Sequence, residues 1–304
     1  MTKELFTKQL FTKQLKERLE EITECKVYIK TNTKNNGVEL ESLTIIREGR
    51  NAYPTIYVDI WWDIYKAGES FDDIVAKVLE WEKKSALNRK MDLDFFLDFD
   101  RVKENLRYKI INTEKNIDLL NSIPHKDFLD LSKVYLVEVN TPEIGRGTVL
   151  VSNVHMEMWK TTWEELDQYA TEQTEKQNPS YIFDMVDMAT EMLEKVVDAE
   201  LPDFEIPHGQ MYVITNQERY LGAAVLLYKD VFKNFAAEKE EDLYILPSST
   251  HEVIVIPASL AQYQGIKGLK EMVKEVNSTH VEPEEFLSDN IYFYDRQTDS
   301  IKIV

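Results

Sequence analysis

The feature that most constrains this chain is a pair of short apolar runs separated by a polar link. The runs occupy residues 243–246 and 253–256, and the link at 247–252 reads Pro-Ser-Ser-Thr-His-Glu. Short apolar runs bounded by turn residues are typical of buried strands. The pattern predicts two strands that pair as a hairpin, with two serines, a histidine and a carboxylate at their connection.

Strands and helices alternate along the rest of the chain without a repeating βαβ period. Further strands are expected at residues 26–30, 39–47, 55–59, 108–113, 129–139, 148–152, 211–215, 222–227, 290–294 and 300–304. Helices are expected at residues 3–24, 60–90, 114–121, 162–175, 181–199, 231–238 and 260–276. This order favours an α+β fold with mixed, largely antiparallel sheets, packed helices and a helical acidic middle segment.

Composition divides the chain into three expected regions. Residues 1–140 form an N-terminal α+β region, residues 141–209 an acidic helical region, and residues 210–304 a C-terminal α+β region that carries the 247–252 link. Between Glu157 and Glu205 there are fourteen acidic residues and only three lysines. Acidic helices of this kind are usually solvated faces with an apolar stripe toward the core.

The predicted first helix contains a tandem repeat of Leu-Phe-Thr-Lys-Gln, at residues 5–9 and again at 10–14. A shift of five residues turns a helix by about 140° net, so the two copies present different faces. Only one copy can therefore pack in register with the apolar stripe.

Charge and cysteine content exclude several classes of protein. There are 36 basic residues against 55 acidic ones, and the net charge is −19. Such a chain repels phosphate backbones and anionic lipid, so we expect neither direct nucleic-acid binding nor membrane binding. A single cysteine, Cys25, allows no internal disulfide, and no window is apolar enough to cross a bilayer. The sequence predicts a soluble, cytoplasmic protein.

The 247–252 link holds the sharpest catalytic candidates. A serine nucleophile needs a histidine base and a carboxylate that orients it. Ser249 and His251 share a face if the link is extended, whereas Glu252 points the other way. The carboxylate would then be Asp289 or Glu284. Since no Gly-x-Ser-x-Gly elbow occurs, and short hydroxyl residues are what a turn needs, a structural turn is the favoured interpretation.

Metal and cofactor motifs are weak. The five histidines are scattered, and none has the His-x-x-x-His spacing of a helical zinc site. A spatial cluster of His251, Glu252, His280 and Asp289 stays open as an alternative. No glycine-rich loop has the spacing that holds a nucleotide phosphate. We therefore predict neither a metal nor a cofactor.

A second group of candidates lies in the acidic region. Trp159 and Trp163 stand four residues apart, where two rings on one helix can share a face. Core packing is the favoured interpretation, and exposed rings would instead anchor a protein interface beside acidic helices. The candidate binding residues are Trp159, Trp163, Glu164, Glu165, Asp184, Asp187 and Glu191.

Three segments of the C-terminal part carry a recognisable pattern: Met-Tyr-Val-Ile-Thr-Asn at 211–216, Leu-Gly-Ala-Ala at 221–224 and Tyr-Ile-Leu-Pro-Ser-Ser-Thr-His-Glu-Val at 244–253. They resemble an uncharacterised family of anaerobic Gram-positive bacteria and their mobile elements. The family is known only as a domain of unknown function. The resemblance extends over most of the chain and implies no activity, so it assigns no catalytic residue.

The sequence as a whole favours a non-enzymatic role. The expected function is that of an acidic binding or regulatory protein that acts through protein–protein contacts, encoded by a mobile element or phage. One alternative is a hydrolase that uses Ser249 and His251 with a carboxylate from elsewhere. The other is a nucleic-acid mimic that inhibits a DNA- or RNA-binding protein.

Overall fold

The predicted hairpin around the polar link is present in the computed structural model of the protein. Strand β10 (Leu243–Leu246) pairs antiparallel with β11 (Val253–Pro257), and Leu246 lies opposite Ile254. The structure describes residues 7–85, 94–141, 145–187, 190, 209–261 and 265–304. By its contacts the chain forms two compact units, residues 1–95 with 140–147 and residues 96–139 with 148–304. The three regions expected from composition are a different division of the chain, and they stay a prediction.

The first unit is a three-stranded antiparallel sheet with three helices. Its helices are α1 (Lys8–Thr23), α2 (Val58–Lys66) and α3 (Phe71–Ser85), and its strands, in sheet order, are β1 (Lys26–Thr33), β2 (Glu39–Ile46) and β3 (Ile56–Tyr57). The β1–β2 connection places Asn36 and Gly37 at positive φ, as the Asn-Gly sequence predicts. Ser70 accepts a hydrogen bond from the Asp73 amide and so caps α3.

Helix α1 packs its second repeat copy against the core of this unit. Phe11, Leu15 and Leu19 are fully buried, whereas Ile22, expected on the same stripe, is 46% exposed. The buried stripe therefore passes through Phe11 of the copy at 10–14. Leu5 and Phe6 of the first copy lie outside the described residues, and Lys8 and Gln9 of that copy form the first turn of α1.

The second unit begins with a small antiparallel sheet. Its strands are β4 (Leu106–Asn112), β5 (His125–Phe128), β6 (Leu131–Thr141) and β7 (Gly145–Leu150), of which the first three run in the order β4-β6-β5 and β7 pairs with β6. The end of β6 from residue 140 and the start of β7 up to residue 147 are grouped with the first unit. Short helices, α4 (Phe99–Val102), α5 (Ile117–Leu120) and α6 (Asn153–Trp159), join the elements. Helix α7 (Trp163–Gln177) packs on β4.

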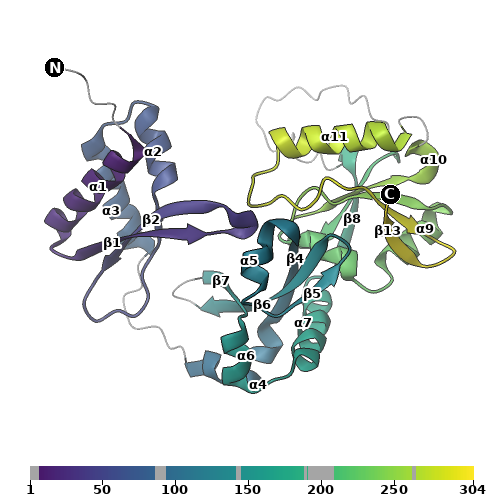
Figure 1. The fold of residues 1–304 in the computed structure, drawn as a ribbon, viewed down its shortest axis with the longest axis horizontal. Helices are drawn as coiled ribbons and strands as arrows, with labels where there is room; N and C mark the ends of the chain where they lie inside the picture. The colour runs from purple at the N-terminus through teal and green to yellow at the C-terminus, as the bar shows by residue number, and fades with distance from the viewer. Residues whose placement is uncertain (1–6, 86–93, 142–144, 188–189, 191–208, 262–264) are drawn as a thin grey trace. The chain divides into compact units, whose positions relative to one another are not determined.

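The larger sheet of this unit has six strands in the order β13-β12-β10-β11-β9-β8, and every neighbouring pair is antiparallel. The strands not yet given are β8 (Ser180–Asp184), β9 (Tyr212–Asn216), β12 (Tyr292–Asp295) and β13 (Ser300–Ile303). Helix α11 (Gly265–Thr279) lies across one face (Figure 1). Leu269 and Val273 of this helix pack against Leu246 and Ile256 of the sheet. Helices α9 (Val231–Lys239) and α10 (Ala258–Ala261) complete the unit.

The α+β class is confirmed, but three local expectations are wrong. Residues 180–184 form strand β8 instead of the start of a helix, because the aromatic and β-branched run pairs with β9. Residues 222–227, expected as a strand, form a buried 3-10 helix. Trp159 ends α6 and Trp163 begins α7, so the two rings do not share one helix. None of the described helices is long and apolar enough to cross a membrane.

Candidate functional site

The 247–252 link is held on both sides by backbone hydrogen bonds. The Thr250 amide donates to the Glu285 carbonyl at 2.8 Å, and the Leu287 amide donates to the Ser248 carbonyl at 3.0 Å. On the other side, the Ala223 amide donates to the Thr250 carbonyl at 3.1 Å. The link therefore lies between two other segments that both fix its backbone, and its residues Ser248, Ser249 and Thr250 are buried.

Gly222 lets the segment at residues 221–224 approach this link closely. A Cβ at position 222 would lie 1.9 Å from Thr215 Oγ1 and 2.4 Å from the His251 carbonyl oxygen. The same Thr215 hydroxyl donates to the His251 carbonyl at 2.7 Å. Only glycine fits here, since no side chain can occupy a space already filled by backbone.

The two ring nitrogens of His251 hold the site together. The Leu221 amide donates to Nδ1 at 3.2 Å, so the network assigns the ring proton to Nε2. Nε2 then donates to Glu285 Oε1 at 3.0 Å. The imidazole therefore orients the Glu285 carboxylate, and neither of its nitrogens contacts the Ser249 hydroxyl.

The side chains of Ser249 and Glu252 interact with each other. The Ser249 hydroxyl accepts a hydrogen bond from the His251 amide at 3.0 Å, and it also interacts with the Glu252 carboxyl group in a way that favours the charged form. Burial raises the pKa of Glu252, and the facing carboxylate of Glu285 adds to the rise, whereas His251 and Ser249 oppose it. Ser249 itself is only 6% exposed.

These side chains line one open cavity of about 360 Å³. Its wall combines two carboxylates with two histidines, one arginine, two hydroxyls and two valines. The lining residues are Val213, Thr215, Arg219, Ser249, His251, Glu252, His280, Val281 and Glu285. The Arg219 guanidinium lies over the Phe183 ring at 4.2 Å from its centre. The cavity thus combines polar and apolar groups, and two carboxylates are among them.

Three of the four catalytic candidates meet in this cavity. Ser249, His251 and Glu252 line it, whereas Asp289 accepts a hydrogen bond from Asn277 and does not line it. The carboxylate beside His251 is Glu285, next to the expected alternative Glu284. Sequence reasoning missed Glu285 and Arg219 because each lies more than 30 residues from His251 and no local pattern connects them.

One family model, described as "Family of unknown function (DUF5688)", matches residues 4–296. The chain belongs to the DUF5688 family. No curated protein and no solved structure matches it. Membership confirms the resemblance to a family of unknown function and assigns no activity.

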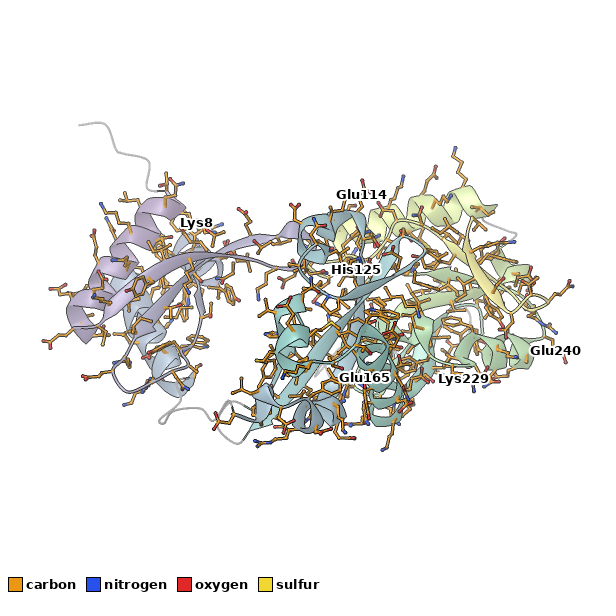
Figure 2. All side chains as sticks on the ribbon, turned by 60° about the horizontal axis from the view of Figure 1, so that its bottom comes forward. Lys8, Glu114, His125, Glu165, Lys229 and Glu240 are labelled. Atoms are coloured by element: carbon orange, nitrogen blue, oxygen red, sulfur yellow. The ribbon has the colours of Figure 1, made fainter. Side chains whose placement is uncertain are left out.

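The acidic-region candidates of this DUF5688 protein are dispersed. Trp159 is 7% exposed and its Nε1 donates to the Phe96 carbonyl, whereas the half-buried Trp163 lies beneath Lys126. Glu164 is exposed in the first turn of α7. Glu165, which is labelled in Figure 2, closes a capping box with Thr162.

The remaining acidic candidates lie near strand β8 or beyond the described residues. Asp184 ends β8 and accepts hydrogen bonds from the Val186 and Gly209 amides. Asp187 follows β8 and is exposed, and Glu191 lies outside the described residues. Asp184 and Asp187 thus lie beside an edge of the large sheet.

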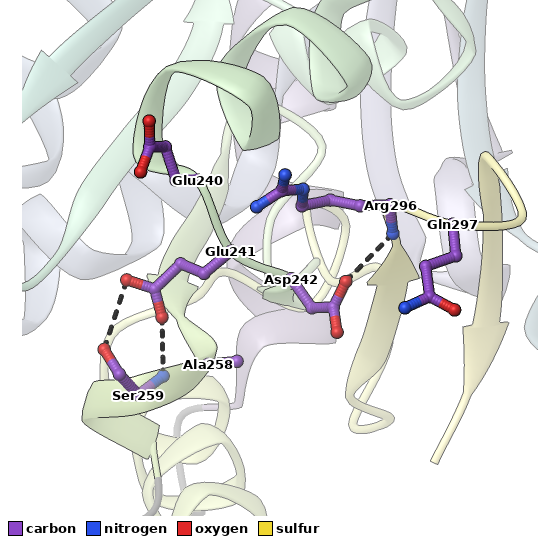
Figure 3. Close-up of a pocket in the computed structure, with 7 residues that line it drawn as sticks. All are labelled: Glu240, Glu241, Asp242, Ala258, Ser259, Arg296 and Gln297. Carbon is purple, nitrogen blue, oxygen red and sulfur yellow. Dashed lines mark hydrogen bonds between the residues drawn. The ribbon is translucent and has the colours of Figure 1, made fainter.

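A second cavity of the DUF5688 fold, of about 500 Å³, is explained by structural contacts (Figure 3). Glu241 accepts from the backbone and hydroxyl of Ser259, and Asp242 accepts from the Arg296 amide. In the part of the chain that the structure describes, no three His, Cys, Asp or Glu side chains are placed to hold a metal ion. The cavity around His251 is therefore the better candidate site.

Proposed function

We propose that this protein is a cytoplasmic binding protein that acts through protein–protein contacts, and that the cavity around His251 takes a lysine or arginine side chain of its partner. The proposal rests mainly on one observation: Glu252 and Glu285 line the same cavity, and a hydrogen bond from His251 holds the Glu285 carboxylate in place. From the sequence resemblance we further propose that the protein has a regulatory role in an anaerobic Gram-positive bacterium or in one of its mobile elements.

Charge supports a basic partner. Two carboxylates that share a partly buried cavity repel each other, and a cation placed between them removes that repulsion. The net charge of −19 also speeds encounter with a basic surface. The two valines can contact the aliphatic stem of lysine or arginine, whose charged end then reaches the carboxylates.

The test is an NMR titration with acetyl-arginine amide and acetyl-lysine amide, followed through the His251 ring signals. Acetyl-citrulline amide is the matched uncharged probe. We expect the basic probes to bind. Glu285→Gln should weaken their binding at least tenfold, or by about 1.4 kcal/mol, because it removes one of the two carboxylates. Glu282→Gln, an exposed neighbour, is the control. Equal binding of citrulline, or an equal effect of both variants, would contradict the proposal.

Glu252→Gln is expected to weaken binding but to stabilise the free protein at pH 7. The pKa of Glu252 is raised by burial, so its charged form destabilises the fold. A raised pKa means that stability is highest below the ordinary glutamate range and falls as pH rises through the folded pKa. Thermal melts at pH 4 and pH 7 should show that the gain from glutamine appears only at the higher pH. A gain that is equal at both pH values would refute this assignment.

The hydrolase alternative makes a different prediction for Ser249→Ala. In the observed geometry the hydroxyl supports the His251 amide and Glu252, so we expect its loss to cost about 1 kcal/mol of stability. A hydrolase would instead lose turnover with its stability unchanged. Urea denaturation and turnover of p-nitrophenyl acetate distinguish the two outcomes.

A further inference from the structure

Strand β8 is the outermost strand of the six-stranded sheet, and one of its edges faces no other described strand. The Met185 amide donates to the Met211 carbonyl, which makes 185 and 211 a hydrogen-bonded pair in the β8–β9 ladder. In an antiparallel ladder such pairs alternate with non-hydrogen-bonded ones. The backbone N–H and C=O groups of Ser180, Ile182 and Asp184 therefore point away from β9.

The side chains of β8 suit pairing with another strand. The strand reads Ser-Tyr-Ile-Phe-Asp, with no lysine, proline or glycine to block its edge. Tyr181 is 47% exposed and Ile182 is 38% exposed, so both faces of the strand present apolar surface at the edge. The Tyr181 and Phe183 rings contact each other with centres 4.2 Å apart.

We propose that the outer edge of β8 receives an extended basic and apolar segment of a protein partner as an added antiparallel strand. Directly opposed residues in an antiparallel pair contact each other. An apolar partner residue would lie opposite Ile182, β-branched residues opposite Tyr181 and Phe183, and a lysine opposite Asp184. The predicted order, from N- to C-terminus, is lysine, valine, isoleucine, valine, threonine.

The charge of the protein favours a basic partner segment at the β8 edge over a second copy of the chain. Each copy carries a net charge of −19, so two copies repel each other. A basic segment is attracted instead, and Asp184 with the exposed Asp187 concentrates negative charge at one end of the strand. This proposal rests on the same kind of partner as the proposed function. Arg219 of the cavity lies over Phe183 of β8, but the outward backbone groups of β8 and the carboxylates of the cavity are different groups that can be tested apart.

The probe is a fluorescein-labelled peptide, Lys-Lys-Val-Ile-Val-Thr-Lys, measured by anisotropy. N-methylation of its isoleucine removes the N–H that would face Ile182, and we expect at least tenfold weaker binding. N-methylation of the following valine is the matched control, since that N–H points away from β8, and binding should be retained. Equal binding of both methylated peptides would overturn the proposal.

On the protein side, Ile182→Pro should abolish peptide binding and Ile182→Val should retain it. The Ile182 amide points outward, so proline leaves the β8–β9 ladder intact and the melting transition should persist. Ile182→Pro should still bind acetyl-arginine amide, and Glu285→Gln should still bind the peptide. If Glu285→Gln lost peptide binding and Ile182→Pro kept it, the peptide would bind in the His251 cavity. That result would contradict the proposal for the β8 edge and support the proposed function. A dimer that Ile182→Pro dissociates would assign the edge to a second copy and overturn it too.

Discussion

Replacing Lys133 with methionine is expected to lower the free energy of unfolding by about 3 kcal/mol, because it removes the buried cation that pairs with the partly buried Asp167 carboxylate and leaves that carboxylate only Tyr135 and the exposed Lys126. Lys133 is 5% exposed and its Nζ donates to Asp167 on α7 and to Thr171 at 2.6 Å. The same ammonium lies 4.2 Å from the centre of the Tyr108 ring. Methionine fills the volume of the stem and supplies none of these interactions.

The electrostatics of this pair give the prediction a pH dependence. Burial alone would raise the pKa of Asp167, but the hydrogen bond and charge of Lys133, together with Tyr135 and Lys126, outweigh it and hold the pKa below its usual value. Burial lowers the pKa of Lys133, and Asp167 partly offsets this. A depressed carboxyl pKa contributes stability that is present above the ordinary aspartate range and lost as pH falls through the folded pKa. The difference between wild type and Lys133→Met should therefore shrink toward low pH.

Lys126→Met is the matched control. Lys126 also reaches Asp167, at 3.5 Å, but its side chain is 56% exposed, and exposed pairs contribute about 0–1 kcal/mol. Urea unfolding should place Lys126→Met near wild type, and Lys133→Met with Asp167→Leu should recover part of the lost stability. Equal losses in the two lysine variants would show that burial does not decide the strength of this pair.

Local sequence patterns predicted the parts of the fold that depend on near neighbours. The β10–β11 hairpin, the β1–β2 hairpin and the Ser70 cap each involve residues within a short stretch, where turn chemistry and periodicity are sufficient. Strand β8 was missed because a run of five residues is too short to separate strand from helix without its partner β9.

Contacts between distant residues could not be predicted. Asp130 accepts hydrogen bonds from Ser288, Asn290 and Tyr292, which follow it by about 160 residues. Glu285 likewise reaches His251 only because the 285–288 segment pairs with the 247–252 link. The residue types in the site were therefore visible in the sequence, and the choice of Glu285 over Glu284 or Asp289 required the backbone path.

The path of the 247–252 link also depends on Gly222. Gly222→Ala is expected to destabilise the fold by about 4 kcal/mol or more, a loss that is typical of a steric conflict in a buried site. The new Cβ would meet Thr215 Oγ1 at 1.9 Å, the His251 carbonyl at 2.4 Å and the Asn216 amide at 2.8 Å. The segment has little freedom to move aside, because Arg219 and Leu221 already occupy the left-handed region.

Gly147→Ala is the control, since a Cβ there meets nothing within 4 Å. A second variant locates the conflict. Thr215→Ala removes the closest atom from the Gly222→Ala protein, but the His251 carbonyl and the Asn216 amide belong to the backbone and cannot rotate away. We therefore expect the double variant to stay far less stable than Thr215→Ala alone in urea unfolding, and to bind acetyl-arginine amide more weakly. Full recovery in the double variant would mean that the threonine hydroxyl alone requires glycine at this position, and that the link carrying His251 can shift without cost.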